Sequence, residues 1–184
     1  IHYSDQLITF SGRVWDDEDS ASELTIIWSS SLDGDLAIAN QPNDVGEVSG
    51  SAYLSQGEHQ IQLTVQDSAG NVGKANVSIA VGPPNTAPSC EITSPQTGTV
   101  GEAGELITFV GQATDPDVPS DSLAASWSIA GVEMSGSTPS TDGEVLFPYS
   151  DLDIGSHTIT LTVTDEVGAT CSDNIVYTLS LIHI

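Results

Sequence analysis

The chain has 184 residues, with 26 Asp and Glu against two Lys and Arg, which gives a formal net charge of −24 at pH 7. A surface with this much negative charge repels phosphates and anionic headgroups, which excludes nucleic acid and anionic membranes as partners. It favours the binding of cations and an environment of high salt concentration. No apolar stretch approaches the roughly 20 residues of a membrane span, so no direct membrane insertion of this segment is expected.

The first half of the chain is predicted to form short strands. Residues 24–28 alternate and end on a large aromatic residue, Trp28, which indicates a strand with one buried face. Residues 59–66 alternate more cleanly, and a turn containing glycine leads from them into a second alternating run at 75–81, which predicts a β-hairpin. The predicted inward residues of this hairpin are His59, Ile61, Leu63, Val65, Ala75, Val77, Ile79 and Val81.

A proline-rich segment separates the two halves of the chain. Three prolines occur between residues 82 and 88, which disfavours both helix and central strand and stiffens the backbone. The sequence therefore predicts a first domain at residues 1–82, a linker at 83–88 and a second domain that ends near residue 179.

The second half repeats the first. The run Leu-Ile-Thr-Phe at 7–10, followed by Gly12, Asp16 and Trp28, returns 99 residues later, and the hairpin strand returns at an offset of 98. The second copies are Leu106–Phe109, Gly111, Asp115, Trp127 and the strand around His157, Ile159, Leu161 and Val163. A repeat of this length is a whole domain, so the chain is predicted to be a tandem array.

A further strand is predicted at residues 89–93. Its counterpart in the first domain would precede Ile1, so that domain is expected to lack its first strand through truncation. Apolar residues never recur at helical spacing for three turns, and turn residues punctuate the chain about every ten positions. The fold class is therefore predicted to be all-β, with two tandem Greek-key β-sandwich domains.

These motifs resemble a known group of extracellular modules. The pattern Gly-x-His-x-Ile-x-Leu-Thr-Val-x-Asp at 57–67 and 155–165, together with Asp115-Pro-Asp117 and Asn85-Thr-Ala-Pro88, is similar to repeats of the polycystic-kidney-disease (PKD) type and to related immunoglobulin-like or cadherin-like modules. The Gly-Asp-Gly segment that PKD modules carry after the Trp is absent after Trp127, so the resemblance extends to the superfamily and not to the subfamily.

Two cysteines lie in the second domain. Cys90 is expected on its first strand and Cys171 at the start of its last, two strands that lie side by side in sandwiches of this group, which favours a disulfide over two buried free thiols. A disulfide would place the chain outside a reducing cytosol, in an extracellular or cell-surface location.

Loop carboxylates recur at matching positions in both halves. In a Greek-key sandwich the loops that carry them emerge at one end, where the chain enters the domain, and for the second domain that end is near the linker. Because Ca²⁺ binds carboxylate and carbonyl oxygens, the sequence predicts calcium at each joint between repeats, as in cadherin-like arrays. The candidate ligands are Asp16, Glu18, Asp19, Asp67, Asn85, Asp115, Asp117, Asp121 and Asp165. The alternatives are solvated turns, a carboxylate that caps its own hairpin, and adaptation to high salt.

The remaining candidates favour structural roles. His59 and His157 are predicted to be core or rim residues, since no Ser or Cys nucleophile stands at an interpretable spacing. Trp15, whose counterpart is Thr114, is predicted to anchor its loop rather than to contact a carbohydrate or a partner. No catalytic residue is assigned, so the chain is not expected to be an enzyme.

The sequence thus favours a non-catalytic structural or adhesion array from a large secreted or cell-surface protein. Its expected partners are neighbouring repeats of the same chain and a cell-surface protein or polysaccharide. The alternative is a set of spacer or substrate-targeting modules of a secreted hydrolase. The final residues, 179–184, match a translated sequencing-library adapter, the other interpretation being a true strand end.

Overall fold

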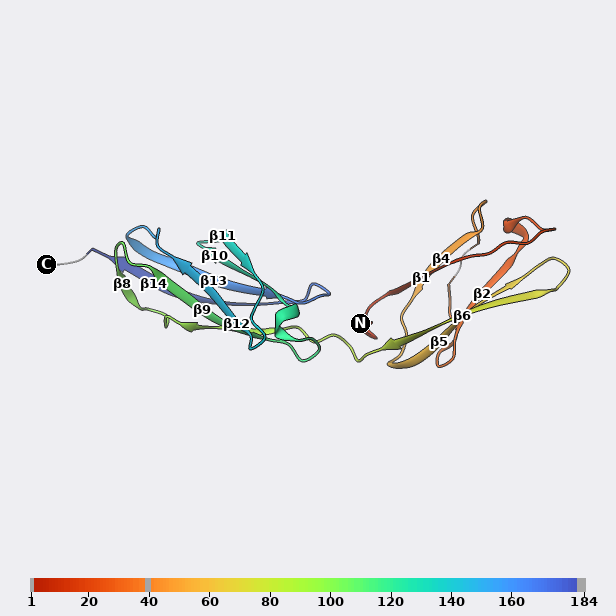
Figure 1. The fold of residues 1–184 in the computed structure, drawn as a ribbon, viewed down its shortest axis with the longest axis horizontal. Helices are drawn as coiled ribbons and strands as arrows, with labels where there is room; N and C mark the ends of the chain where they lie inside the picture. The colour runs from red at the N-terminus through yellow and green to blue at the C-terminus, as the bar shows by residue number, and fades with distance from the viewer. Residues whose placement is uncertain (1, 39–40, 182–184) are drawn as a thin grey trace. The chain divides into compact units, whose positions relative to one another are not determined.

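The computed structural model describes residues 2–38 and 41–181 and divides the chain into two compact units (Figure 1). Unit 1 is Ile1–Asn85 and unit 2 is Thr86–Ile184, so the division falls inside the proline-rich segment 83–88. Residues 182–184, the end of the segment that matches an adapter, lie outside the described residues. Leu179 and Ser180 belong to the last strand of unit 2.

Unit 1 is built from two antiparallel sheets. One sheet pairs β1 with β4, and the other has the order β3-β2-β5-β6. The elements are β1 (Ile8–Arg13), the 3-10 helix η1 (Ala21–Glu23), β2 (Thr25–Ser30), β3 (Gly34–Asp35), β4 (Glu47–Ala52), β5 (Gly57–Gln66) and β6 (Val72–Val81).

Unit 2 has the same arrangement with two additional strands. One sheet has the order β12-β9-β7 and the other has the order β11-β10-β13-β14-β8. The elements are β7 (Ser89–Ser94), β8 (Val100–Glu102), β9 (Ile107–Thr114), the 3-10 helix η2 (Ser120–Ser122), β10 (Ala124–Ile129), β11 (Val132–Ser137), β12 (Glu144–Tyr149), β13 (Gly155–Thr164) and β14 (Thr170–Ser180). The predicted all-β sandwich class is confirmed.

A tryptophan lies in the core of each unit. Trp28 on β2 is 4% exposed and contacts Phe10, while Trp127 on β10 is fully buried and contacts Phe109 and Phe147, which also contact each other. Strand β5 presents its predicted face inward, because His59, Ile61 and Leu63 are buried. The same holds in unit 2 for Ile159, Leu161 and Val163, with His157 half-buried at the strand's start. On β6 the prediction holds only in part: Val81 is buried, whereas Ala75 and Val77 are exposed.

The repeated glycine after the Leu-Ile-Thr-Phe run has a packing cause. A Cβ at Gly12 would lie 2.8 Å from Leu63 Cδ2, and a Cβ at Gly111 would lie 2.5 Å from Leu161 Cδ2. Carbon atoms at that separation overlap strongly, so only glycine lets the strand lie so close to the inward leucine of the opposite sheet.

The two cysteines form a bridge between the sheets of unit 2. Cys90 on β7 and Cys171 on β14 are joined in a disulfide with their Cα atoms 6.0 Å apart. The prediction that these strands are neighbours in one sheet was wrong. β7 pairs with β9, while β14 pairs with β13 and β8, so the disulfide crosses the core from one sheet to the other.

In unit 1 the counterpart of β8 is a short segment near the chain start. Tyr3 forms a parallel bridge with Gly82, as β8 runs parallel to the end of β14 in unit 2, and the Tyr3 side chain is 2% exposed. Within the described residues, no strand pairs with β1 on the side where β7 pairs with β9. One edge of β1 is therefore open.

Candidate functional site

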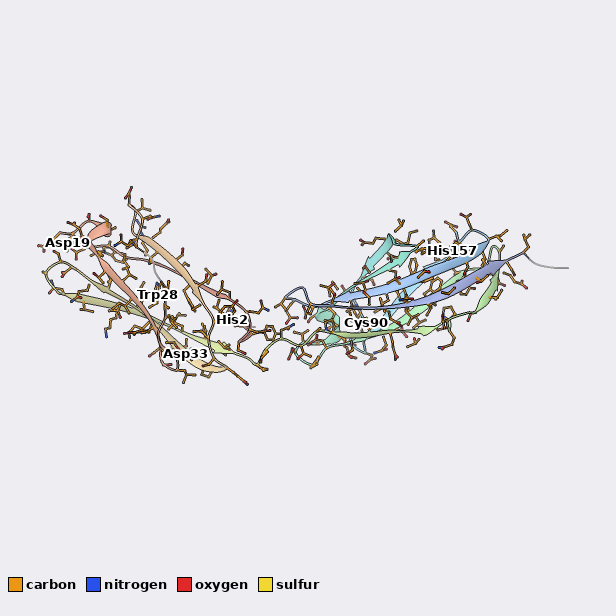
Figure 2. All side chains as sticks on the ribbon, turned by 180° about the vertical axis from the view of Figure 1, so that it is seen from behind. His2, Asp19, Trp28, Asp33, Cys90 and His157 are labelled. Carbon is orange, nitrogen blue, oxygen red and sulfur yellow. A yellow bond between two sulfur atoms is a disulfide. The ribbon has the colours of Figure 1, made fainter. Side chains whose placement is uncertain are left out.

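The first acidic loop of unit 1 folds around Asp16. Its Oδ1 accepts hydrogen bonds from the backbone N–H groups of Glu18 and Asp19, both at 2.9 Å. Asp19 in turn accepts from the backbone N–H and the hydroxyl of Ser68, at 2.7 and 3.0 Å, in the β5–β6 hairpin turn. The two acidic loops of unit 1 thus meet at one end of the sandwich, where Figure 2 shows Asp19.

Asp67, the second acidic position of unit 1, holds the hairpin turn. Its carboxylate accepts the backbone N–H of Asn71 at 2.7 Å and the Asn71 side-chain amide at 2.6 Å. The hydrogen bond from the Asn71 side chain, followed by backbone donors of the turn, lowers the pKa of Asp67. The carboxylate therefore caps its own hairpin, which was the structural alternative to calcium binding.

In unit 2, Asp115 and Asp165 repeat these local bonds. Asp115 Oδ1 accepts from the backbone N–H groups of Asp117 and Val118, at 2.7 and 3.2 Å. Asp165, only 7% exposed, accepts from those of Val167 and Ala169, at 3.1 and 2.7 Å. The other oxygen of Asp115, Oδ2, is buried without a hydrogen-bond partner among the described residues.

The remaining predicted ligands are more scattered. Asp117 Oδ2 accepts the backbone N–H of Thr86 at 2.7 Å, and Asp121 is exposed in η2. Asn85 belongs to unit 1, where its backbone N–H donates to Asp5 at 3.0 Å, and the Glu18 side chain is exposed.

In residues 2–38 and 41–181, no group of three or more His, Cys, Asp or Glu side chains is arranged to hold a metal ion. The acidic residues of both units instead accept hydrogen bonds from the backbone of their own turns. Carboxylates that stabilise turns in this way explain why acidic residues recur at these positions, whether or not a cation also binds.

A buried polar network at the opposite end of unit 1 was missed from the sequence. His59 is 1% exposed; its Nδ1 lies 2.7 Å from the hydroxyl of Ser30 and its Nε2 lies 2.7 Å from the carbonyl of Ser55. Because a carbonyl only accepts, Nε2 carries the hydrogen and Nδ1 accepts from Ser30 in the neutral ring. Figure 2 shows Asp33 of this network and Asp19 on either side of Trp28.

Asp33 completes that network. The Ser55 hydroxyl and backbone N–H donate to it at 2.6 and 3.0 Å, and the Ser55 hydroxyl bond is the main cause that lowers the pKa of Asp33. Its carboxylate lies 3.7 Å from His59 Nδ1. Ser30 is itself buried and accepts the backbone N–H groups of Leu32 and Asp33 at 3.2 Å. Ser, His and Asp thus come together, but they serve a loop and not an accessible nucleophile. Only the bond to the carbonyl recurs in unit 2, where His157 Nε2 lies 2.7 Å from the carbonyl of Asp153, since Ile129 occupies the position of Ser30.

A groove of about 350 Å³ runs beside the end of β1 in unit 1. Its lining residues are Arg13, Val14, Trp15, Leu63, Val65, Gly73, Lys74 and Ala75. The prediction that Trp15 anchors its loop was wrong, because this side chain is 76% exposed. Both basic residues of the chain, Arg13 and Lys74, border this groove.

No protein-family model matches the chain, and no curated protein sequence is significantly similar to it. Among solved structures, the chain is similar to the fibronectin(III)-like modules of Clostridium thermocellum CbhA, with a TM-score of 0.63 and 13% identity over all of this chain and 92% of that one. At this identity the likeness shows the fold alone, an immunoglobulin-like β-sandwich.

Two weaker likenesses carry no argument. A chimeric titin Z1Z2 tandem gives a TM-score of 0.38 at 15% identity over 97% of this chain and 92% of that chain. A bacterial ice-binding adhesin gives 0.46 at 16% identity over 97% of this chain and 58% of that chain.

Proposed function

We propose that the chain forms spacer or adhesion modules of a secreted or cell-surface protein and performs no catalysis itself. The observation that carries the proposal is the filled interior: a tryptophan and its neighbours occupy the core of each sandwich, and the Ser30–His59 pair is buried beneath the surface. The disulfide between Cys90 and Cys171 supports an oxidising compartment. No helix within the described residues is long and apolar enough to cross a membrane.

A serine-reactive fluorophosphonate probe tests the non-catalytic part of this proposal. Ser30 is 5% exposed and its hydroxyl is hydrogen-bonded to His59, so the folded protein should not be labelled. The Ser30→Ala variant is the matched control for any labelling that occurs elsewhere. Labelling of the folded chain that disappears in Ser30→Ala would identify an activated nucleophile and overturn the assignment.

The finer role that we propose is calcium binding by the acidic loop of unit 2. Support comes from the buried Oδ2 of Asp115, which has no hydrogen-bond partner in the described part of the chain, and from a second carboxylate two residues on, that of Asp117, which also accepts the backbone N–H of Thr86. Because the described residues provide no cluster of three such ligands, backbone carbonyls and water would have to complete the shell of six to eight oxygens. Affinity should then be weak, in the range of about 10⁻⁴ to 10⁻³ M that is typical of extracellular modules.

Calorimetric titration with CaCl₂ tests that role. Binding heat that is lost in Asp115→Asn, with a melting temperature that rises in CaCl₂ but not in NaCl of equal ionic strength, would support it. Equal stabilisation by both salts would assign the acidic surface to salt adaptation, and an unchanged melting temperature in chelator would count against calcium.

The alternative, an accessory role beside a secreted catalytic domain, makes a different prediction about neighbouring sequence. A catalytic domain in the same open reading frame would support it. Further repeats and a cell-surface anchor would support the adhesion array.

A further inference from the structure

The open edge of β1 is the main difference between the two units. In unit 2, β7 runs antiparallel to β9, with Ile92 opposite Gly111 and Cys90 opposite Ala113. The matching residues of unit 1 at the offset of 99 are Gly12 and Val14, and β1 is paired only by β4 within the described residues. An unpaired strand edge presents free backbone donors and acceptors, which is a ready template for another strand.

Inward-facing residues beside that edge are exposed in unit 1. Val77 pairs with the buried Ile61 and therefore points inward, yet it is 52% exposed. Its counterpart Ile175, which pairs with Ile159, is only 5% exposed. The inward face of β6 has apolar side chains and lacks the cover that β7 gives to β14.

The groove beside β1 lies at the position that a counterpart of β7 would occupy in unit 1. Gly73, which lines the groove, pairs with Val65 as Cys171 pairs with Val163, so Gly73 is the counterpart of Cys171. In unit 2, Cys171 is the residue that the disulfide joins to β7. A glycine at this position of unit 1 leaves room for a side chain from an incoming strand and removes the partner for a disulfide.

Two basic residues border the groove. In unit 2, Glu91 of β7 stands opposite Gln112 of β9, and the residue of unit 1 at the Gln112 position is Arg13. Opposite charges on directly paired strand residues attract. Arg13 already stands opposite Glu47 of β4 and donates to the carbonyl of Val45, so an acidic residue in the incoming strand would be its second acidic neighbour. Lys74, the other basic residue of the chain, borders the same groove.

We propose that this groove holds a further strand of unit 1, supplied by the polypeptide that precedes Ile1 in a longer protein. The strand runs antiparallel to residues 11–15, with an apolar residue opposite Gly12, a small residue opposite Val14 and an acidic residue opposite Arg13. Tyr3 and Gly82 already mark the position of the parallel strand that follows β7 in unit 2.

The chain itself provides the probe. A copy of residues 87–99, with its cysteine changed to alanine, is fused directly before Ile1, because the offset of 99 then gives the copied strand the spacing that β7 has from β9. The backbone amides of Ser11–Arg13 should exchange with solvent at least tenfold more slowly in the extended chain, and the melting temperature of unit 1 should rise. Two matched controls change the copied strand: Ile92→Asp in the copy should abolish the protection, and Glu91→Lys in the copy should reduce it.

Three results would overturn the proposal. Exchange at Ser11–Arg13 that is unchanged by the extension would show that the groove accepts no such strand. Protection that appears only together with dimerisation in sedimentation would assign the edge to a second copy. Rapid exchange of the same amides in the longer natural protein would show that no upstream segment occupies the groove.

Discussion

Unit 1 and unit 2 place the same kinds of residues at the same strand positions, yet they bury them to different degrees. The inward leucines of β5 and β13 are covered in both units, whereas Val77 on β6 is exposed and Ile175 on β14 is buried. Unit 2 also has a larger aromatic cluster, in which Phe109 contacts Trp127, Phe147 and Tyr177. The comparison shows that alternation determines which way a side chain points, while burial depends on whether a further strand covers it.

Removing the disulfide should produce the largest difference in stability between the two units. Cys90→Ala combined with Cys171→Ala opens a loop with a sequence separation of 81 residues. In the chain-entropy model this lowers the free energy of unfolding of unit 2 by about 4.5 kcal/mol. Differential scanning calorimetry should show the transition of unit 2 moving down while that of unit 1 stays in place. Equal shifts of both transitions would contradict a bridge that acts within unit 2 alone.

Replacing the core glycines should produce a smaller difference in stability between the two units. Gly111→Ala and Gly12→Ala both overpack the core, at a cost of roughly 1–3 kcal/mol. Gly111→Ala should cost more, because its Cβ would also lie 3.3 Å from the Glu91 carbonyl oxygen of β7, whereas the edge beside Gly12 is open. Urea unfolding of each variant measures this ranking, and a larger cost at Gly12 would mean that the two edges do not differ in this way.

Removing the loop carboxylates should affect both units alike. Asp16→Ala and Asp115→Ala each remove an oxygen that accepts two backbone N–H groups, with an expected loss of about 1 kcal/mol of stability per variant. The Asn variants keep that acceptor oxygen and should lose less. Thermal unfolding in chelator measures both series without calcium, and an Asn variant as damaging as Ala would contradict a capping role.

Lowering the pH should produce the smallest difference in stability between the two units, and we expect Asp33 to cause it. Hydrogen bonds from Ser55 hold the pKa of Asp33 below its usual value of 3.8, so the carboxylate binds a proton less readily in the folded state than in the unfolded state. Its stabilisation is complete above pH 3.8 and is lost as the pH falls through the lowered pKa. Denaturant unfolding of unit 1 as a function of pH should therefore be less steep in Asp33→Asn, with unit 2 as the internal control. The same slope in both proteins would remove Asp33 from the acid response.

Much of the fold could be predicted because alternation is a local signal. The inward faces of residues 59–66 and the central position of Trp28 follow from a period of two, and they recur in the second copy. The sheet that contains β7 could not be read in this way, since pairing between strands far apart in sequence depends on the whole topology. That is why the two cysteine strands were predicted to be neighbours although they lie in opposite sheets.

The candidate site was less predictable, for a physical reason. Asp16 and Asp67 satisfy backbone donors of their own turns, and the same residue types at the same spacing are also what a cation requires. The network of Ser30, His59 and Asp33 joins the end of β2, the start of β5 and the turn after β2, and Ile129 replaces Ser30 in unit 2, so neither periodicity nor repetition could indicate it.

Trypsin-like proteases can cut the chain at only two places, and both lie beside the groove next to β1. A trypsin-like enzyme cuts only after Arg13 or Lys74, since unit 2 contains neither Lys nor Arg. Both cleavage sites lie in strands, so the backbone must leave its sheet before it can be cut, and the digestion rate reports local opening of unit 1 alone. Limited proteolysis therefore reports on the open edge of β1. A strand bound in the groove would slow cleavage after Arg13 and after Lys74 together.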